Sequence, residues 1–281
     1  MAGTLYIVAT PIGNLEDVTL RALRVLKEVD LIACEDTRHT RKLLAHYQIS
    51  KSTVSYHEHN ERERGGELVK KLEGGHNIAL VSDAGTPLIS DPGFWVVREA
   101  IDRGITVVPI PGPSAVITAL AAAGLPTDEF AFFGFLPARR AARRARLKEL
   151  SSIESTLIFY EAPHRVKETI EDLRGAFADR ECIIARELTK LHEEFVRGSL
   201  SEIELPEGSA RGEIVLLIGR PQDHANQTKA ETTRSIVEEV KELMNAEGFD
   251  QKAALKRVAR LRGIGKSEAY RLMIAERGRS K

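Results

Sequence analysis

The segment that decides the fold is Leu5-Tyr6-Ile7-Val8-Ala9-Thr10-Pro11-Ile12-Gly13-Asn14-Leu15-Glu16-Asp17, where an apolar run passes into a loop broken by proline and glycine. The pattern recurs where Ile78–Val81 is followed by Ser82-Asp83-Ala84-Gly85-Thr86-Pro87-Leu88-Ile89-Ser90-Asp91-Pro92-Gly93. A short apolar run bounded by turn formers predicts a buried parallel strand. Because ligands bind beyond the carboxyl ends of such strands, the two loops are predicted to form two walls of one small-molecule site.

The alternative is that these loops only connect strands to helices, since such turns are rich in Gly, Pro, Asp and Ser. Two long loops of this composition favour a binding site. Neither contains the GxGxxG pattern, and the sequence has no GxxxxGK[ST] loop. A standard dinucleotide or triphosphate site is therefore not predicted.

Composition predicts an ordinary soluble protein. The chain has 281 residues, of which 29% are charged and 42% hydrophobic, with a net charge of +0, and its length suits about two domains. No apolar stretch approaches the roughly 20 residues of a membrane span, and the first strand leaves no room for a signal peptide. We expect a cytoplasmic protein without membrane association. Cys34 and Cys182 lie in apolar runs and are expected to be buried free thiols, with no metal site.

Residues 1–124 alternate strand and helix patterns, which predicts an α/β domain with a mainly parallel, doubly wound sheet. The predicted strands are Leu5–Ala9, Leu31–Glu35, Thr53–His57, Asn77–Ser82 and Thr106–Ile110. The predicted helices are Leu20–Lys27, Arg38–His46, Glu61–Leu72, Phe94–Arg103 and Pro113–Ala123.

Residues 125–221 are predicted to form a second, mixed α/β domain around the helix Val166–Phe177. A short polar segment separates the last two of its strands, which predicts that these two pair antiparallel. The predicted strands are Ala131–Leu136, Thr156–Glu161, Cys182–Glu187, Glu194–Leu200 and Glu213–Gly219.

The C-terminal part is predicted to be a basic helical tail domain, residues 228–281, after a linker at Arg220–Gln227. From Ala225 to Lys281 there are 13 Lys and Arg residues against 8 Asp and Glu residues. The pattern resembles a helix-turn-helix unit, although such units also serve as packing appendages. The predicted helices are Thr232–Ala246, Gln251–Leu261 and Ser267–Ile274, with turns at Gly248 and Gly263-Ile264-Gly265.

A second basic block has no acidic residue among Arg139, Arg140, Arg143, Arg144, Arg146 and Lys148. Such a run is usually a solvated helix face. The alternative is a stripe that binds the phosphates of a nucleic acid, and composition does not decide between the two.

Charged side chains crowd two predicted strand ends, at Tyr160-Glu161-Ala162-Pro163-His164-Arg165 and at Arg186–Glu194. They either cover a ligand held by the first domain or form a structural ion-pair network. His57 and His59 have metal-ligand spacing, but no third ligand follows in a recognisable pattern, so a polar strand end is favoured.

The sequence resembles the bacterial small-subunit rRNA methyltransferase I family, which consists of ribose 2′-O-methyltransferases of the tetrapyrrole methylase superfamily. The resemblance begins in Leu5–Asp17 and covers six further segments in order. These segments are Cys34–Arg38, Ser82–Gly93, Pro111–Ala115, Phe159–Arg165, Ala185–Lys190 and Gly212–Val215. It implies two α/β domains of the tetrapyrrole methylase (class III methyltransferase) type with a cleft between them, usually in a homodimer, and a small C-terminal helical unit.

The resemblance also implies S-adenosylmethionine as the methyl donor, with no metal. Carried over by position, the donor contacts fall in both loops, at the start of the helix after the fifth strand, and on the second domain. The implied residues are Pro11, Asp83, Gly85, Thr86, Ile89, Ser114, Ala115, Tyr160 and Ile214.

The implied substrate is the ribose 2′-hydroxyl of a cytidine in the decoding region of 16S rRNA, within an assembled small subunit. A base must remove the hydroxyl proton, and the candidates are Glu161 and Glu187, with Arg165 and Lys190 holding phosphate or lowering a neighbour's pKa. The arginines expected to contact RNA are Arg139, Arg140, Arg143 and Arg144. The alternatives are a tetrapyrrole methyltransferase and a non-catalytic RNA-binding factor for ribosome assembly.

Overall fold

The computed structural model describes residues 1–177, 179–205, 212–221, 235–247, 249–261 and 265–279. By their contacts the residues form two compact units, Met1–Arg220 and Pro221–Lys281, which are described separately below. Most of the predicted linker, the predicted helix start at Thr232 and the predicted turns at Gly248 and Gly263 lie outside the described residues.

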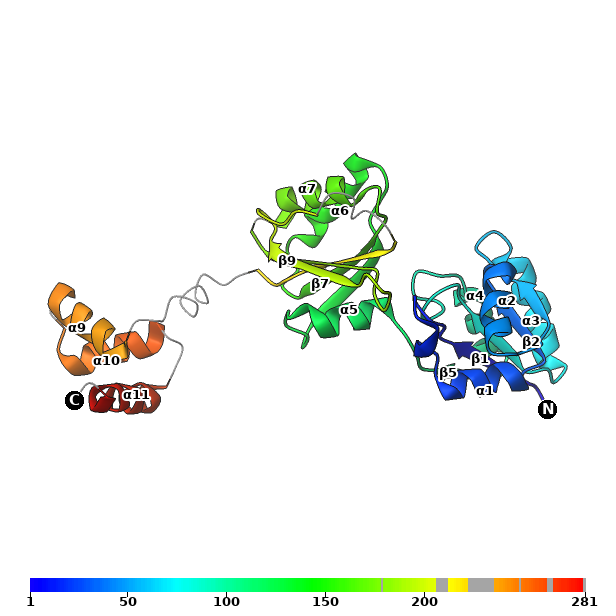
Figure 1. Ribbon diagram of the computed structural model, residues 1–281, viewed down its shortest axis with the longest axis horizontal. Coiled ribbons are helices and arrows are strands. Elements are labelled where there is room, and N and C mark those ends of the chain that lie inside the picture. The colour runs from blue at the N-terminus through cyan, green and yellow to red at the C-terminus, as the bar shows by residue number, and fades with distance from the viewer. Residues whose placement is uncertain (178, 206–211, 222–234, 248, 262–264, 280–281) are drawn as a thin grey trace. The chain divides into compact units, whose positions relative to one another are not determined.

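The first sheet of the larger unit is parallel throughout, with the strand order β3-β2-β4-β1-β5 (Figure 1). This confirms the predicted doubly wound sheet. Its strands are β1 (Thr4–Val8), β2 (Leu31–Cys34), β3 (Thr53–Ser55), β4 (Ile78–Val81) and β5 (Thr106–Ile110). The order brings β4, β1 and β5 side by side, so the loops that follow these three strands meet at one edge.

Two pairs of helices cover the two faces of this sheet. Ala79 and Val81 of β4 pack in one apolar cluster with α1 (Leu20–Glu28) and α2 (Thr37–His46). The alternate residues Ile78 and Leu80 pack in the other cluster, against α3 and α4. The two clusters follow from the alternation of side chains along a strand. The helices of the second face are α3 (Glu61–Glu73) and α4 (Phe94–Asp102), and a short 3-10 helix, η1 (Leu15–Asp17), lies in the loop after β1.

The second sheet has the order β6-β7-β10-β8-β9. Its strands are β6 (Phe130–Phe135), β7 (Thr156–Glu161), β8 (Glu181–Arg186), β9 (Glu194–Ser199) and β10 (Ile214–Ile218). Helices α6 (Arg140–Leu150) and α7 (Val166–Phe177) cover one face, and α5 (Ala115–Ala123) covers the other (Figure 1). Helix α5 therefore packs with the second sheet, whereas the sequence predicts that it belongs to the first domain, residues 1–124.

The predicted pairing of the last two strands is wrong. Strand β10 lies between β7 and β8 and is antiparallel to both, while β9 pairs only with β8 at the edge of the sheet. All five residues of β10 are apolar and buried, so this strand requires a central position with both faces covered. Strand β9 carries Glu194 and Arg197, which suits its position at the edge of the sheet, where charged side chains are common.

The smaller unit has three helices in its described residues: α9 (Ile236–Glu247), α10 (Gln251–Leu261) and α11 (Lys266–Arg279). They share an apolar core that includes Val240, Leu255 and Met273. The Ser235 hydroxyl before α9 donates a hydrogen bond to Glu276 of α11 at 2.6 Å. The predicted helical character of this part of the chain is confirmed.

Cys34 and Cys182 are buried and free, as predicted. A search of the described helices finds none that is both long and apolar enough to cross a membrane.

Candidate active site

The loops after β1, β4 and β5 are joined by hydrogen bonds. Thr10 and Gly85 exchange backbone bonds, with N–O distances of 2.9 and 3.0 Å. The Thr10 hydroxyl donates to the Ser82 carbonyl at 3.1 Å, and the Thr86 hydroxyl donates to the Pro113 carbonyl at 3.2 Å. The three loops therefore hold one another in fixed positions at the carboxyl edge of the first sheet.

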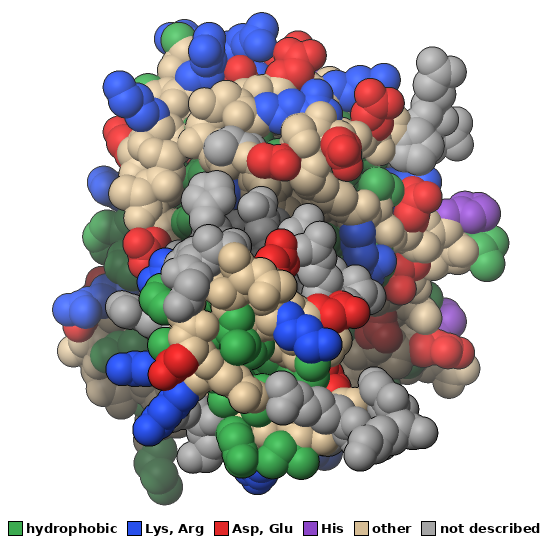
Figure 2. All heavy atoms as spheres, turned by 90° about the vertical axis from the view of Figure 1, so that its left-hand side faces the viewer, with side chains coloured by type: hydrophobic (Ala, Val, Ile, Leu, Met, Phe, Trp, Pro, Cys, Tyr) green, Lys and Arg blue, Asp and Glu red, His purple; other side chains and the backbone are tan. Residues whose placement is uncertain are grey.

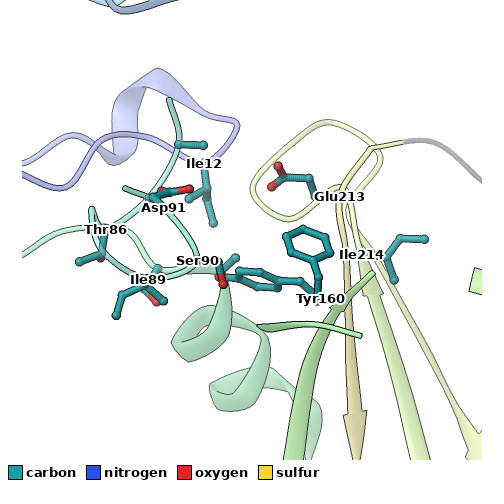
Figure 3. Close-up of a pocket in the computed structure, with 13 residues that line it drawn as sticks. Ile12, Thr86, Ile89, Ser90, Asp91, Tyr160, Glu213 and Ile214 are labelled. Carbon is teal, nitrogen blue, oxygen red and sulfur yellow. The ribbon is translucent and has the colours of Figure 1, made fainter. Parts of the chain in front are cut away.

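A pocket at this edge, called the first pocket below, is lined from both sheets (Figure 3). The loops of the first sheet and the start of α5 contribute Ile12, Ala84, Gly85, Thr86, Ile89, Ser90, Asp91, Ser114 and Ala115. The second sheet contributes Phe135, Tyr160, Glu213 and Ile214.

A more open second pocket adjoins the first, and the two share Ile12, Ala84 and Glu213. The remaining residues that line the second pocket are Pro11, Gly13, Leu15, His39, Asp83, Pro163, Lys190 and Gly212.

All nine residues that the resemblance assigns to the donor line one of these two pockets. Pro11 and Asp83 line the second. The seven in the first pocket are Gly85, Thr86, Ile89, Ser114, Ala115, Tyr160 and Ile214. Residues far apart in the sequence are thus brought together, while their contact with a donor remains a prediction.

Backbone strain is concentrated in the loops around these pockets. Five non-glycine residues in the described parts of the chain have a positive φ. Leu88 (72°) and Ser90 (66°) lie in the loop after β4, and Glu187 (50°) and Thr189 (65°) lie in the loop after β8; only Gln48 lies elsewhere. Such conformations cost on the order of 1–3 kcal/mol each and collect at functional sites. Both loops therefore have shapes that the surrounding structure imposes.

The loop after β1 approaches the loop after β8 closely at Gly13. A Cβ atom on Gly13 would lie 2.7 Å from Cγ of Lys190 and 2.9 Å from the carbonyl oxygen of Leu188. No side chain fits in this space. The glycine therefore allows the loops of the two sheets to meet beside the second pocket.

The first pocket is acidic. Burial, with smaller contributions from the charges of Glu35, Glu213 and Asp83, raises the pKa of Asp91 to about 6. Burial, together with the charges of Glu213 and Asp91, raises the pKa of Tyr160 to about 12. Among the described residues that line this pocket there is no Lys or Arg. An environment of this kind favours a positively charged ligand.

Sequence reasoning missed Asp91 and Glu213. Both lie inside quoted segments, Ser82–Gly93 and Gly212–Val215, so their positions were visible. What distinguishes them is their place in the pocket. Figure 3 shows the two carboxylates directed toward one another from opposite sides of it.

Glu161 does not fit the role of a base. Its side chain is completely buried, and Oε1 accepts hydrogen bonds from Arg165 Nη2 at 2.5 Å and from the backbone of Ala162 at 2.7 Å. Its other oxygen accepts from the Thr169 hydroxyl at 2.6 Å. A carboxylate satisfied in this way has no position left for a substrate proton. The structural ion-pair network, left open by the sequence, is what the structure shows at Glu161 and Arg165.

Glu187 is also paired. Its Oε1 accepts from Lys190 Nζ at 2.9 Å, and the carboxylate lies against Gly212, where an added Cβ would be 1.6 Å from it. Lys190 itself lines the second pocket. Of the four residues predicted to act in catalysis, Lys190 is the one that lines either of these two pockets.

The basic block forms α6, and its arginines differ in exposure. Arg143 is fully buried, donates to Asp172 at 2.8 Å and lies 3.4 Å from Glu168. The prediction that Arg143 contacts RNA is therefore wrong, because a buried guanidinium does not reach a phosphate. Arg139, Arg140 and Arg144 are exposed.

The exposed surface around these arginines carries both signs of charge. Arg140 pairs with Glu171 at 3.2 Å and with Asp172 at 3.1 Å. Figure 2 shows Lys and Arg side chains beside Asp and Glu side chains along the top of its view. His57 and His59 stack edge to face, and no group of three metal-binding side chains occurs in the described parts of the chain.

Comparison with known proteins gives the family. Residues 4–204 match the family Tetrapyrrole (Corrin/Porphyrin) Methylases. The chain is 49% identical to ribosomal RNA small subunit methyltransferase I of Halalkalibacterium halodurans over 96% of this chain and 94% of the relative. It is 47% identical to the Pseudomonas aeruginosa protein of the same name, over 99% of each.

Solved structures share the fold. Uroporphyrin-III C-methyltransferase of Thermus thermophilus, complexed with S-adenyl homocysteine, superposes with a TM-score of 0.53 at 19% identity, over 77% of this chain and 97% of that one. The sequence similarity, the matched family and this fold agree: the chain belongs to the tetrapyrrole methylases, in the family of ribosomal RNA small subunit methyltransferase I.

Proposed function

We propose that this protein transfers a methyl group from S-adenosylmethionine to the ribose 2′-hydroxyl of a cytidine in the decoding region of 16S rRNA. The observation that carries the proposal is the first pocket, in which residues that the family resemblance assigns to the donor converge from both sheets. The similarity to rRNA small subunit methyltransferase I over nearly the whole chain supports rRNA as the acceptor.

The first pocket suits this donor. Ile89 and Ile214 supply apolar surface for an adenine ring, and Thr86 and Ser114 supply hydroxyl groups for polar contacts. S-adenosylmethionine provides a methyl group on a positively charged sulfur, and its neutral thioether product lacks that charge. An acidic pocket therefore binds the donor more tightly than the product.

The second pocket suits the acceptor nucleotide. It adjoins the first pocket and is more open, and it has Lys190 and His39 on its walls. A lysine ammonium there is suited to bind the phosphate of a nucleotide. A ribose bound in the second pocket then lies next to the donor, and such positioning contributes on the order of 7–11 kcal/mol to catalysis.

RNA outside the pockets is proposed to contact the exposed arginines of α6, namely Arg139, Arg140 and Arg144. A groove beside α6 and α7 is lined by Arg144 and Lys148, together with the acidic Asp172. Such contacts with phosphates supply affinity without base recognition. The basic C-terminal unit is proposed to bind a neighbouring segment of the same RNA.

The family resemblance leads us to propose a homodimer that acts on the assembled small subunit. Sedimentation of the purified protein tests the dimer. Parallel assays on naked 16S rRNA and on small subunits test the substrate, and we expect faster methylation of the subunits.

The proposed function is tested by incubating the protein with labelled S-adenosylmethionine and unmodified small subunits, followed by mapping of the labelled nucleoside. Label on a cytidine 2′-oxygen is the expected result. Donor binding without label on RNA contradicts the proposal. In that case a tetrapyrrole acceptor and a non-catalytic role in ribosome assembly are tested next.

A further inference from the structure

We propose that Glu213 is the general base that accepts the proton of the ribose hydroxyl. This inference rests on the proposed function. A base for this reaction must reach both the donor methyl group and the acceptor hydroxyl, so it must lie where the two bound molecules meet. The two pockets share three lining residues, Ile12, Ala84 and Glu213. Of these, only Glu213 has a side chain that can accept a proton.

The position of Glu213 is fixed by the fold. It directly precedes Ile214, the first residue of the central strand β10, and Ile214 pairs with Glu161 of β7 and Arg186 of β8. Gly212, which precedes Glu213, has a φ of +70°, which favours glycine and sets the direction in which the chain enters the strand. Figure 3 shows the Glu213 side chain directed into the pocket, near Tyr160.

The carboxylate of Glu213 is available for a substrate. No described residue forms a hydrogen bond or an ion pair with it, and the side chain is exposed. Its charge acts on its neighbours instead, because it raises the pKa of both Asp91 and Tyr160.

Other candidate bases near the pockets are less suitable. Glu161 and Glu187 are held by Arg165 and Lys190. Tyr160, with its pKa raised to about 12, keeps its proton at neutral pH.

Asp83 and Asp91 lie in the loop after β4, on the side of the first sheet. Asp83 accepts a hydrogen bond from the backbone of Asp36 at 3.0 Å. Asp91 lines only the first of the two pockets. Asp91 faces Glu213 across the first pocket, and Lys190 and His39 lie with Glu213 on the walls of the second. None of these three residues is paired with Glu213, which is the carboxylate that lines both pockets.

The step is a displacement at carbon. The ribose oxygen forms a bond to the methyl carbon, the bond between that carbon and sulfur breaks, and its electron pair stays on sulfur. The hydroxyl proton passes to a carboxylate oxygen of Glu213 and later to solvent. No further reactant is required.

The test measures single-turnover methyl transfer to small subunits between pH 6.5 and 9.5 for the wild type, Glu213→Gln and Glu213→Asp. Calorimetry with the donor alone sets the concentration that saturates each protein. We expect Glu213→Gln to be slower by about 100-fold or more at neutral pH. Its rate should rise about tenfold per pH unit, because solvent must then ionise the hydroxyl. Glu213→Asp keeps a carboxylate and should recover part of the rate with the shallow pH profile of the wild type.

Glu28→Gln is the matched control, since Glu28 lies on the surface and pairs with Arg24; it should leave the rate unchanged. A Glu213→Gln rate within about threefold of the wild type would overturn the inference. Equally slow Gln and Asp variants with the pH profile of the wild type would overturn it too, because they indicate a positioning role. If the wild type itself places no methyl group on a cytidine 2′-oxygen, the proposed function fails instead.

Discussion

The two sheets contribute to the pockets in different ways. The loops of the first sheet are held by backbone hydrogen bonds such as those between Thr10 and Gly85. They present backbone and small side chains together with Ile12, Ile89 and Asp91. The strand ends of the second sheet present large and charged side chains, many of them engaged with one another, as in the pair Glu161–Arg165. The difference shows that a loop can be assigned to a site from its glycines and prolines, whereas a charged side chain is assigned only after its partners are known.

The first prediction tests whether the partners of a charged side chain determine its role. It compares arginines of α6, of which one is buried and its neighbours are exposed. Arg143→Ala removes a buried guanidinium and leaves the buried Asp172 with weaker partners. We expect a loss of about 3–5 kcal/mol in the free energy of unfolding, measured by urea denaturation. Arg139→Ala, at an exposed position, should change it by less than about 0.5 kcal/mol. Equal effects of the two substitutions would contradict the assignment of Arg143 to the interior.

The second prediction concerns the ion pair of the second sheet. Glu161→Gln removes the charge that balances Arg165 and weakens the bond from Thr169. We expect a loss of about 2–3 kcal/mol in the free energy of unfolding. Methyl transfer by the protein that remains folded should stay within about threefold of the wild type. A stable variant with a rate reduced by about 100-fold would instead make Glu161 the base.

The third prediction concerns the loops of the first sheet. Gly85 has a φ of +81°, and a Cβ added there would lie 3.3 Å from Cγ2 of Ile12. Gly85→Ala should therefore distort the loop and weaken donor binding by about 1–2 kcal/mol, measured by calorimetry. Gly66→Ala is the control, because an added Cβ meets nothing within 4 Å in α3. Unchanged donor affinity for Gly85→Ala would indicate that this loop does not contact the donor.

The smallest predicted effect concerns pH and Asp91. Its pKa in the folded protein is about 6, above its ordinary value of about 3.9 in an unfolded chain. The folded protein therefore holds this proton more tightly than the unfolded chain does. This contribution to the free energy of unfolding is present at low pH and is lost as the pH rises through 6. Asp91→Asn should raise the free energy of unfolding at pH 7.5 by roughly 1 kcal/mol, a figure reduced because the group is partly exposed.

The Asp91 effect should shrink toward pH 4, where the carboxyl group is protonated in the folded protein. Urea denaturation of the wild type and of Asp91→Asn at the two pH values measures it. Asp102→Asn, on the surface of α4, controls for the substitution itself. A lower stability of Asp91→Asn at pH 7.5 would contradict the assigned cause of the raised pKa.

The sequence predicted the first sheet well. Its strands alternate with helices, which predicts parallel pairing but not the order of the strands, and the loops after β1 and β4 lie at the predicted edge. The second sheet was harder, because five consecutive apolar residues in β10 do not state which strands flank them. Burial on both faces, rather than the length of the connection, determined the central position of β10.

The site was predictable where backbone determines it. Gly85, Thr86 and Ser114 line the first pocket, because the loops that contain them are held at the edge of the sheet, and their contact with the donor stays a prediction. The charged residues were not predictable in the same way. Glu161 and Glu213 both lie at strand ends of the second sheet, and only tertiary packing shows that the first is buried beside Arg165 while the second lines both pockets.

The most direct measurement is a crystal structure of the protein with S-adenosylmethionine bound. We predict that the donor lies in the first pocket, in contact with the loop at Gly85 and with Ile214. Its methyl group should face the junction at which Glu213 meets the second pocket. A donor bound away from the first pocket, or with its methyl group directed away from Glu213, would contradict the account.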